Sequence, residues 1–265
     1  MWEPGIVEAP AQSMMVEPRA PIAREVDEFL ASMPVAYARA FSAREVEEHV
    51  RIVARRAGQL AHAEAVRGAS ETTFVCVVAD DQPGLLSFVT DALLVHGLSV
   101  ANAELYCRRC GDGKLEAVDF FSLEPAQPGA REQAIEPAEL ASFAQTLREL
   151  IAEDQLISQQ PSDRDTIPVP GPKPCRVYFE LEALRRGEYV LIVEAPDFAG
   201  LLFAISSALH GQGIRITASR VRTEHGQAKD RFQVESIGSR PMNAERLCDV
   251  QQAVLSAVQA GSSKT

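Results

Sequence analysis

The chain carries one pattern twice, and this repetition restricts its possible folds more than any other feature. The segment DQPGLL at residues 81–86 returns as DFAGLL at residues 197–202, an offset of 116 positions. At the same offset, Gly97 matches Gly213. A repeat of this length is far longer than the period of a helix or strand, so it indicates duplication of a whole structural unit. The sequence therefore predicts two domains with the same order of elements.

Hydrophobic periodicity predicts similar elements around each copy of the repeat. A β-branched and aromatic run before the segment predicts a strand, and a 3.6-residue apolar period after it predicts a helix. In the first copy we expect a strand at 72–79, a helix at 84–96, strands at 98–107 and 115–123, and a helix at 136–153. In the second copy we expect strands at 176–182 and 189–194, a turn at Arg186-Gly187 between them, a hairpin at 224–227 and a final helix at 243–259.

This order of elements predicts an α+β fold. Strand, helix, two strands and a helix form the core of a ferredoxin-like unit of the βαββαβ type, with an antiparallel sheet. We expect two such domains preceded by a short helical N-terminal segment. The predicted divisions are a flexible N-terminus with a helical segment at 1–67, a first domain at 68–154, a proline-rich linker at 155–174 and a second domain at 175–265.

The first 67 residues combine a flexible stretch with helices. Residues 1–20 contain three prolines and little periodicity, so we expect them to be flexible, and residues 22–31 predict a short helix. Ser42 and Glu45 have the spacing of a capping box, which predicts a helix over residues 42–57. A strand at 60–67 would precede the first domain. His49 lies beside the apolar face of the helix and is expected to be packed rather than catalytic.

Composition and charge exclude several classes of function. The net charge of -11 and the pI of about 5.0 argue against nucleic acid or an anionic membrane surface as a partner. No apolar run approaches the roughly 20 residues that span a bilayer. The N-terminus lacks the basic region of a signal peptide, so we expect a cytoplasmic protein.

The cysteines favour neither a disulfide framework nor a cofactor. The chain has five cysteines, an odd number, which favours free thiols. Cys107 and Cys110 have C-x-x-C spacing, but no second pair or nearby histidine completes a zinc site. The pair also precedes a hairpin rather than opening a helix, where a redox thiolate is stabilised. We therefore expect no metal and no cofactor.

The repeated segment can bind an anion. In the first copy it connects a buried strand to a helix, and the free amide groups of a first helical turn favour negative charge. Pro83 suits a first helical turn because its missing N–H costs nothing there, and Gly84 permits close backbone approach. A carboxylate could therefore bind here. On this motif alone, a tight strand-to-helix connection without a ligand is an equal alternative.

These motifs resemble a known family. D-x-P-G-L, a following helix, Gly-(Leu/Ile)-x-(Val/Ile), a hairpin and the Asp-x-Phe of Asp119 and Asp230 resemble the ACT domain, a small amino-acid-binding regulatory module. Two such units preceded by residues 37–41 and 48–51 are similar to the C-terminal part of the bifunctional uridylyltransferase/uridylyl-removing enzymes, which modify the nitrogen-regulatory PII protein. The resemblance covers roughly residues 35–260.

The resemblance implies regulation rather than catalysis. In that family the ACT pair senses glutamine and controls two catalytic domains placed earlier in the chain. Nucleotidyl transfer would need a Gly-Ser followed by a D-x-D on a strand, and a metal-dependent phosphohydrolase would need a His-Asp dipeptide; we find neither. Only about 70 residues precede the first repeat, too few for either catalytic domain. P-loop, G-x-G-x-x-G and G-x-S-x-G patterns are missing as well. We therefore expect no catalytic residues, although a family-based name would still call the protein a uridylyltransferase.

The first copy is the favoured amino-acid site. The α-carboxylate would meet the amides of Gln82, Gly84 and Leu85, and the ammonium group would meet Asp81 or Asn102. Asp81 can instead cap the helix. The predicted ligand-binding residues are Asp81, Gln82, Pro83, Gly84, Leu85 and Asn102.

The second copy is expected to be a weaker site, because Ala199 replaces the proline and Phe198 replaces a polar residue. The residues predicted for this second site are Asp197, Phe198, Gly200 and Leu201. In the family, ligands lie between paired domains, and the module would couple a free amino acid, preferably glutamine, to a protein partner. The alternative is a ligand-free scaffold that forms homodimers through the sheet edges.

Overall fold

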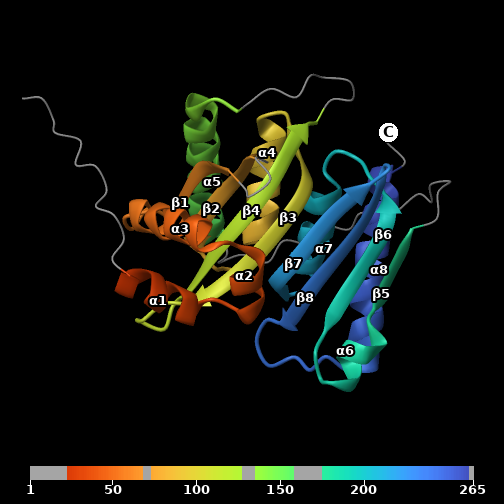
Figure 1. Cartoon of the computed structure of the whole chain (residues 1–265). Helices are drawn as coiled ribbons and strands as arrows, with labels where there is room; N and C mark the ends of the chain where they lie inside the picture. Colours follow the sequence, from red (N-terminus) through yellow and green to blue (C-terminus); the bar gives the residue numbers. More distant parts are fainter. Residues whose placement is uncertain (1–22, 68–72, 127–134, 158–174, 263–265) are drawn as a thin grey trace, which may run out of the picture.

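The computed structural model describes residues 23–67, 73–126, 135–157 and 175–262 (Figure 1). The predicted flexible segment 1–20 and all but the first three residues of the predicted linker lie outside them. The helices are α1 (Ala23–Ser32), α2 (Val35–Ala40), α3 (Ala43–Arg55), α4 (Leu85–Val95), α5 (Pro137–Ile157), α6 (Leu181–Arg185), α7 (Leu201–Gly211) and α8 (Ala244–Ser262). The strands are β1 (Ala61–Arg67), β2 (Thr73–Asp80), β3 (Leu98–Arg109), β4 (Leu115–Pro125), β5 (Arg176–Phe179), β6 (Val190–Pro196), β7 (Ile214–Glu224) and β8 (Gln227–Ser236). The predicted α+β class and the antiparallel pairing are confirmed.

All eight strands of the described residues form one sheet, not two. Their order is β1-β2-β4-β3-β7-β8-β6-β5, and every pair is antiparallel. The halves join where β3 pairs with β7, with Glu104 opposite Arg220 at the centre. Both strands carry a register shift at the same repeat position, between Val100 and Asn102 in β3 and between Ile216 and Ala218 in β7. The two halves are thus related by a pseudo-two-fold axis through the β3–β7 junction.

Each half takes its edge strand from the N-terminal side, which corrects the predicted βαββαβ order. β1 pairs with β2 at the outer edge of the first half, so the sheet continues across the predicted boundary at residue 68. A sixth element of a βαββαβ unit would follow α5 and pair with β2. The strand that follows α5 is β5, and it pairs with β6 in the second half.

The strand predicted at residues 176–182 is too long. β5 ends at Phe179, and residues 181–185 form α6 instead. Leucine, glutamate, alanine and arginine are good helix formers, and this segment contains little else. The backbone turns back at once, because the Glu180 N–H donates to the Val190 carbonyl at 2.8 Å. The chain therefore enters β6 through a helical turn.

One face of the sheet is covered by four helices along its whole width. α5, α4, α7 and α8 pack in that order, and a continuous apolar core lies between them and both halves of the sheet. Residues at alternate positions of each strand enter this core, as β-strand geometry requires. None of the described helices is long and apolar enough to cross a membrane.

Among the described residues, the other face is covered over the first half by α1, α2 and α3 (Figure 1), and over the second half only by the short helix α6, whose Ala183 packs on Val190 and Ile192 of β6. The capping box predicted for α3 is present, with the Ser42 side chain and the Glu45 backbone and side chain paired. His49 is buried, as predicted, and its Nδ1 lies 2.6 Å from the Tyr37 hydroxyl. Burial lowers the pKa of His49 to about 4. This histidine is therefore a neutral core residue.

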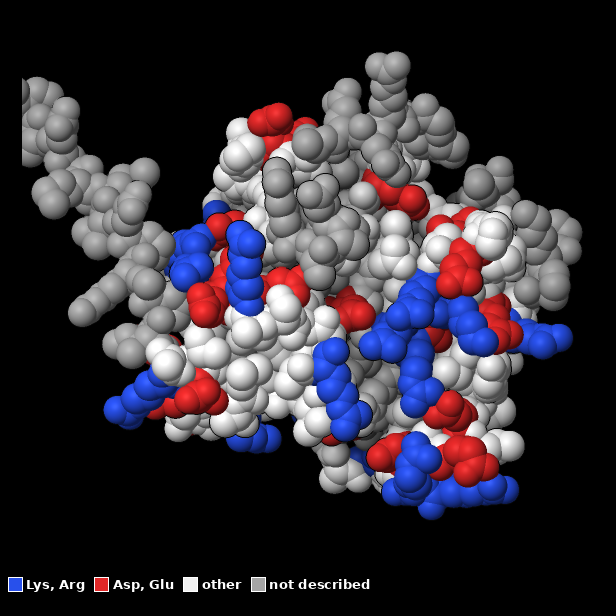
Figure 2. All heavy atoms as spheres, in the orientation of Figure 1, with Lys and Arg blue, Asp and Glu red and all other residues white. Residues whose placement is uncertain are grey.

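Beyond α6, no described helix covers this face of the second half. Strand positions that are apolar beneath α1–α3 are occupied here by exposed charged residues, including Arg222, Lys229 and Arg231. Figure 2 shows Lys and Arg side chains gathered over these strands. Several of them pair with acidic neighbours: Arg231 lies 2.7 Å from Glu180, and Lys229 lies 3.5 Å from Glu194. The two halves thus share one layout but differ in what covers this face.

Candidate ligand-binding site

The repeated segment forms the same turn in both halves. In the first half the Leu85 N–H donates to the Gln82 carbonyl at 3.2 Å, and Gly84 has φ 82° and ψ -5°. In the second half Leu201 donates to Phe198 at 3.0 Å. This is the geometry of a type II turn, which favours proline at its second position and requires positive φ at its third. Pro83 therefore lies in the turn before the helix, not in the first helical turn as predicted.

The first turn faces the second half of the molecule across a hollow that we call the first interface pocket. About 490 Å³ in it is free of protein atoms, a volume that includes space open to solvent, and the centre of a water-sized sphere fits in only about 40 Å³ of it. The first half contributes the turn that follows β2, the start of α4 and residues of β3 and β4. The second half contributes the end of α7 and the start of β7. The polar lining residues are Asp81, Gln82, Ser87, Cys107, Asp119, Ser206, His210, Arg215 and Thr217.

An acid and a base from opposite halves meet in this pocket. The Asp81 carboxylate lies 3.9 Å from the Arg215 guanidinium, and its side chain is only 8% exposed. The Cys107 thiol donates to the Asp81 carboxylate at 3.0 Å. Burial raises the pKa of Asp81, while the Cys107 hydrogen bond and Arg215 act in the opposite direction. Arg215 also forms an ion pair with Glu235, so the guanidinium is held at the mouth of the pocket.

Two further titratable groups line the pocket. Asp119 is 5% exposed and accepts a hydrogen bond from the Tyr106 N–H at 3.2 Å. Burial raises its pKa well above the ordinary value. The ring of His210 packs over Gly84, and its buried Nδ1 has no hydrogen-bond partner in the described structure. A buried imidazole nitrogen without a partner is a costly arrangement unless a ligand or water completes it.

The structure brings most of the predicted site residues together. Asp81, Gln82, Gly84 and Leu85 all line the first interface pocket. The Leu85 N–H is occupied by the Gln82 carbonyl, so it is not available for a carboxylate in this state. Pro83 shapes the turn and is not among the lining residues.

Asn102 does not lie in the pocket. Residues Leu105 and Cys107 of β3 face the pocket side of the sheet, and side chains alternate along a strand. Asn102 therefore points to the opposite face, where it lines a different hollow with Phe41 and Arg220. The sequence places this residue on the correct strand but does not show which face it occupies.

The pseudo-symmetric position holds a second interface pocket with different chemistry. Its empty space, including space open to solvent, is about 370 Å³, and the predicted residues Asp197, Phe198, Gly200 and Leu201 are among those that line it. Asp230 also lines it and is 1% exposed, and burial raises its pKa to about 7. The positions equivalent to Arg215 and His210 are occupied by Ser99 and Leu94. The second pocket therefore has carboxylates but lacks the matching base.

Phe198 packs against the helical layer. A Cβ atom on Gly261 would lie 2.3 Å from the Phe198 ring, so the absence of a side chain at Gly261 in α8 leaves room for this ring. The aromatic side chain thus stabilises the second turn against α8 as well as lining the pocket.

Sequence reasoning missed Arg215 and His210 as site residues. Both come from the second half and reach the pocket only because β3 pairs with β7, a contact between residues more than a hundred positions apart. The signal was present in the repeat, since a serine and a leucine in one copy become an arginine and a histidine in the other. In the described residues, no group of three or more His, Cys, Asp or Glu side chains is placed to hold a metal.

The two cysteines of the C-x-x-C pair lie in different environments, Cys107 in β3 and Cys110 in the turn that follows it. Cys107 lines the first interface pocket, and the Cys110 N–H donates to the Lys114 carbonyl at 2.8 Å in the turn. Burial, together with the nearby Asp81 carboxylate, raises the pKa of the Cys107 thiol. Cys107 is therefore a neutral hydrogen-bond donor in this state rather than a thiolate nucleophile.

Comparison with known proteins gives one consistent relationship. No protein-family model matches the chain. It is similar to the bifunctional uridylyltransferase/uridylyl-removing enzyme of Rhodospirillum rubrum, with 26% identity over 190 residues that make up 69% of this chain and 19% of that protein. The enzyme of the same name from Phenylobacterium zucineum is 27% identical over 240 residues, 88% of this chain and 24% of that protein. The corresponding protein from Gluconobacter oxydans is 29% identical over 202 residues, 72% of this chain and 20% of that protein.

The chain thus spans about a fifth to a quarter of the length of these curated relatives. Its similarity is to a part of those enzymes, as expected of a partial regulatory region.

Proposed function

We propose that this chain is a non-catalytic regulatory module, built from two ACT-type units, that binds a free amino acid in the first interface pocket. The observation that carries the proposal is the meeting of Asp81 and Arg215 from opposite halves, 3.9 Å apart at the pocket. A free amino acid carries an ammonium and a carboxylate on one carbon. One buried acid and one base facing the same hollow are complementary to that pair of charges.

The binding mode follows from these positions. In this proposal the ligand carboxylate pairs with Arg215 and with amides of the turn other than that of Leu85, and the ligand ammonium pairs with Asp81. Its side chain extends toward His210, whose unpartnered Nδ1 offers one hydrogen bond. A carboxamide such as that of glutamine supplies a donor or an acceptor to that nitrogen, and for this reason glutamine is the favoured ligand.

The wider role is regulation in nitrogen or amino-acid metabolism through a protein partner. It is supported by the similarity to part of the uridylyltransferase/uridylyl-removing enzymes. A ligand that contacts both halves also changes the interface between them, and such a change is what couples a binding site to a partner. The rival proposal of a ligand-free scaffold requires free sheet edges. Strands β3 and β7 are already joined within the chain, which leaves β1 and β5 for that purpose.

Isothermal titration calorimetry with each of the twenty common L-amino acids tests the proposal. L-Glutamine is expected to bind and to raise the melting temperature, whereas D-glutamine and butyramide, which lacks both the α-ammonium and the α-carboxylate, are not. Arg215→Ser introduces the residue found at the equivalent position of the second copy. It should weaken binding about ten-fold or more, since a charge-assisted hydrogen bond contributes roughly 1.5–3 kcal/mol.

Arg185→Gln is the matched control, because Arg185 lies in the second half, pairs with Glu182 on α6 and does not line the pocket. It should leave the affinity unchanged. If all twenty titrations show no heat at millimolar ligand and no amino acid raises the melting temperature, the module does not bind amino acids and the scaffold function is favoured.

A further inference from the structure

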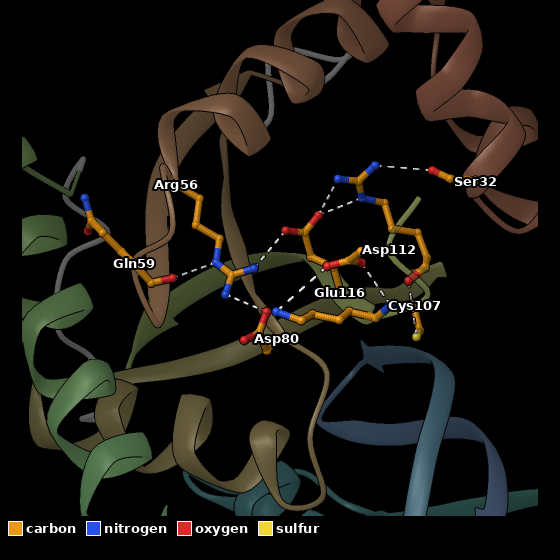
Figure 3. Close-up of polar contacts among 9 residues, drawn as sticks. Ser32, Arg56, Gln59, Asp80, Cys107, Asp112 and Glu116 are labelled. Atoms are coloured by element: carbon orange, nitrogen blue, oxygen red, sulfur yellow. Dashed lines mark hydrogen bonds and ion pairs between the residues drawn. The ribbon is translucent and has the colours of Figure 1, made fainter. Parts of the chain in front are cut away.

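A cluster of charged side chains lies on the opposite face of the sheet from the first interface pocket. Arg56, at the C-terminal end of α3, reaches Asp80 at 2.7 Å and Glu116 at 2.8 Å. Arg108 reaches the second oxygen of Glu116 at 2.6 Å. Figure 3 shows the Arg56 guanidinium between the Asp80 and Glu116 side chains. We call Arg56, Asp80, Arg108 and Glu116 the charge cluster.

The charge cluster connects two of the N-terminal helices, α1 and α3, to the sheet. Arg56 belongs to the end of α3, and the Arg108 guanidinium donates to the Ser32 hydroxyl at the end of α1 at 3.3 Å. The same guanidinium lies 5.0 Å above the ring of Phe29 in α1. Arg56 and Glu116 are buried, with side chains about one tenth exposed. Burial strengthens the two pairs made by Glu116 relative to surface pairs, whereas the Arg56–Asp80 pair is more exposed on its Asp80 side.

Each strand that carries the cluster also carries a pocket residue at the adjacent position. Asp80 is followed by Asp81, Arg108 is preceded by Cys107, and Glu116 is followed by Ala117, and these three neighbours all line the first interface pocket. Successive side chains of a strand point to opposite faces, so one short stretch of backbone holds both sets. The Cys107–Asp81 hydrogen bond of 3.0 Å joins β3 to β2 on the pocket side, and the cluster joins the same strand ends on the other side.

We propose that Arg56 is a positioning residue of the first interface pocket, and that through the charge cluster pocket occupancy is coupled to the docking of α1–α3. This inference rests on the proposed function for the identity of the ligand. Arg56 fixes the end of β2 and thereby the direction in which Asp81 faces the pocket. A ligand that takes the Asp81 carboxylate away from Cys107 shifts the ends of β2 and β3, and both ends carry residues that hold the helices.

The coupling is reciprocal, because a ligand that favours one arrangement of the charge cluster binds less tightly when the charge cluster is weakened. Residues that never touch the ligand therefore change its affinity. The output surface is formed by α1–α3, the elements that cover only this half of the sheet.

The test compares two adjacent arginines at the end of α3. Arg56→Gln and the milder Asp80→Ala, whose wild-type side chain is 58% exposed, both cut the link to β2. Arg55→Gln is the control, since Arg55 pairs with Glu64 on β1, away from the pocket. By calorimetry with L-glutamine as the probe, the first two variants should bind at least five-fold more weakly, Arg56→Lys should recover part of the loss, and the control should stay within two-fold.

Hydrogen–deuterium exchange distinguishes the proposed coupling from a purely structural role of the charge cluster, because a structural role predicts no change in exchange when the ligand binds. L-Glutamine should slow amide exchange in α1 and α3 of the wild-type chain, and this slowing should be absent in Asp80→Ala. Equal affinities for Asp80→Ala and the wild type, or unchanged exchange in α1–α3 when glutamine binds, would overturn the inference.

A ligand-free arm separates this inference from the proposed function. If the wild-type chain binds no glutamine, the proposed function fails. The coupling through the charge cluster is then tested without any ligand, by measuring amide exchange in α3 of the Asp81→Asn and Cys107→Ala variants. Faster exchange in α3 than in the wild type supports the coupling through the sheet, and unchanged exchange in α3 refutes it.

Discussion

Gly84 is subject to two separate constraints. Its φ of 82° is unfavourable for any residue with a Cβ atom, and a Cβ placed there would lie 3.0 Å from Cε1 of His210. Gly97 has a similar φ of 69°, but its Cβ would meet nothing within 4 Å. The two glycines therefore separate the cost of the backbone conformation from the cost of contact with the opposite half.

We predict that Gly84→Ala lowers the free energy of unfolding more than Gly97→Ala. The left-handed conformation costs roughly 1–2 kcal/mol in each variant, and Gly84→Ala also displaces the His210 ring from the turn. Urea denaturation measures both losses, and calorimetry should show weaker amino-acid binding for Gly84→Ala alone. Equal losses in the two variants would mean that the ring moves freely and that Gly84 is needed only for its φ.

The same residue shows how far single positions can be predicted. The sequence indicates that a glycine is required at position 84, but the reason it suggests, close backbone approach, is only part of the explanation. Asp81 was placed correctly at the turn because its neighbours in the chain determine its position. Arg215 was not, since its contact with Asp81 depends on which strands pair in the folded chain.

At the scale of elements, the two type II turns are a natural comparison. Pro83 occupies the second turn position in the first half and Ala199 in the second, and both turns keep the same hydrogen bond. Proline at this position is compatible with the turn and restricts the unfolded chain.

We predict that Ala199→Pro raises the free energy of unfolding by about 0.4–1 kcal/mol, through the lower entropy of the unfolded state. Chemical denaturation measures the change, and Ala204→Pro inside α7 is the contrasting control. The Ala204 N–H donates to the Gly200 carbonyl at 2.9 Å, so a proline there breaks a helical hydrogen bond and should destabilise the chain. A loss of stability in Ala199→Pro would show that the second turn differs from the first.

Element prediction succeeded where the apolar period is long and local. The helix expected at 84–96 is α4 at Leu85–Val95, and the strand expected at 115–123 is β4 at Leu115–Pro125. It failed at residues 181–185, where helix formers override a strand interpretation, and in the order of the edge strands. The position of β5 beside β6 rather than β2 is decided by packing of the whole sheet, which a local sequence pattern does not reveal.

At the scale of the whole molecule, the pseudo-two-fold axis explains why the two halves pair with each other. Glu104 and Arg220 occupy equivalent positions of the repeat and lie opposite each other at the centre of the β3–β7 junction. Their side chains are 3.8 Å apart. If two copies of the same half paired in this register, the centre would hold two glutamates or two arginines. Like charges opposite each other destabilise a strand pair, so this position favours the pairing of unlike halves.

We predict that Arg220→Glu lowers the free energy of unfolding by about 0.5–1 kcal/mol, since it places like charges opposite each other at the junction. The double variant Glu104→Arg/Arg220→Glu restores opposite charges and should recover most of the loss, although neither single change does. Arg222→Glu is the control, because Arg222 lies opposite the neutral Asn102. Urea denaturation at low and high salt measures the effect, which should shrink as ions screen the exposed pair. If Arg220→Glu costs no more than Arg222→Glu, or the double variant recovers nothing, the register of the junction is set by the apolar core beneath it and not by this pair.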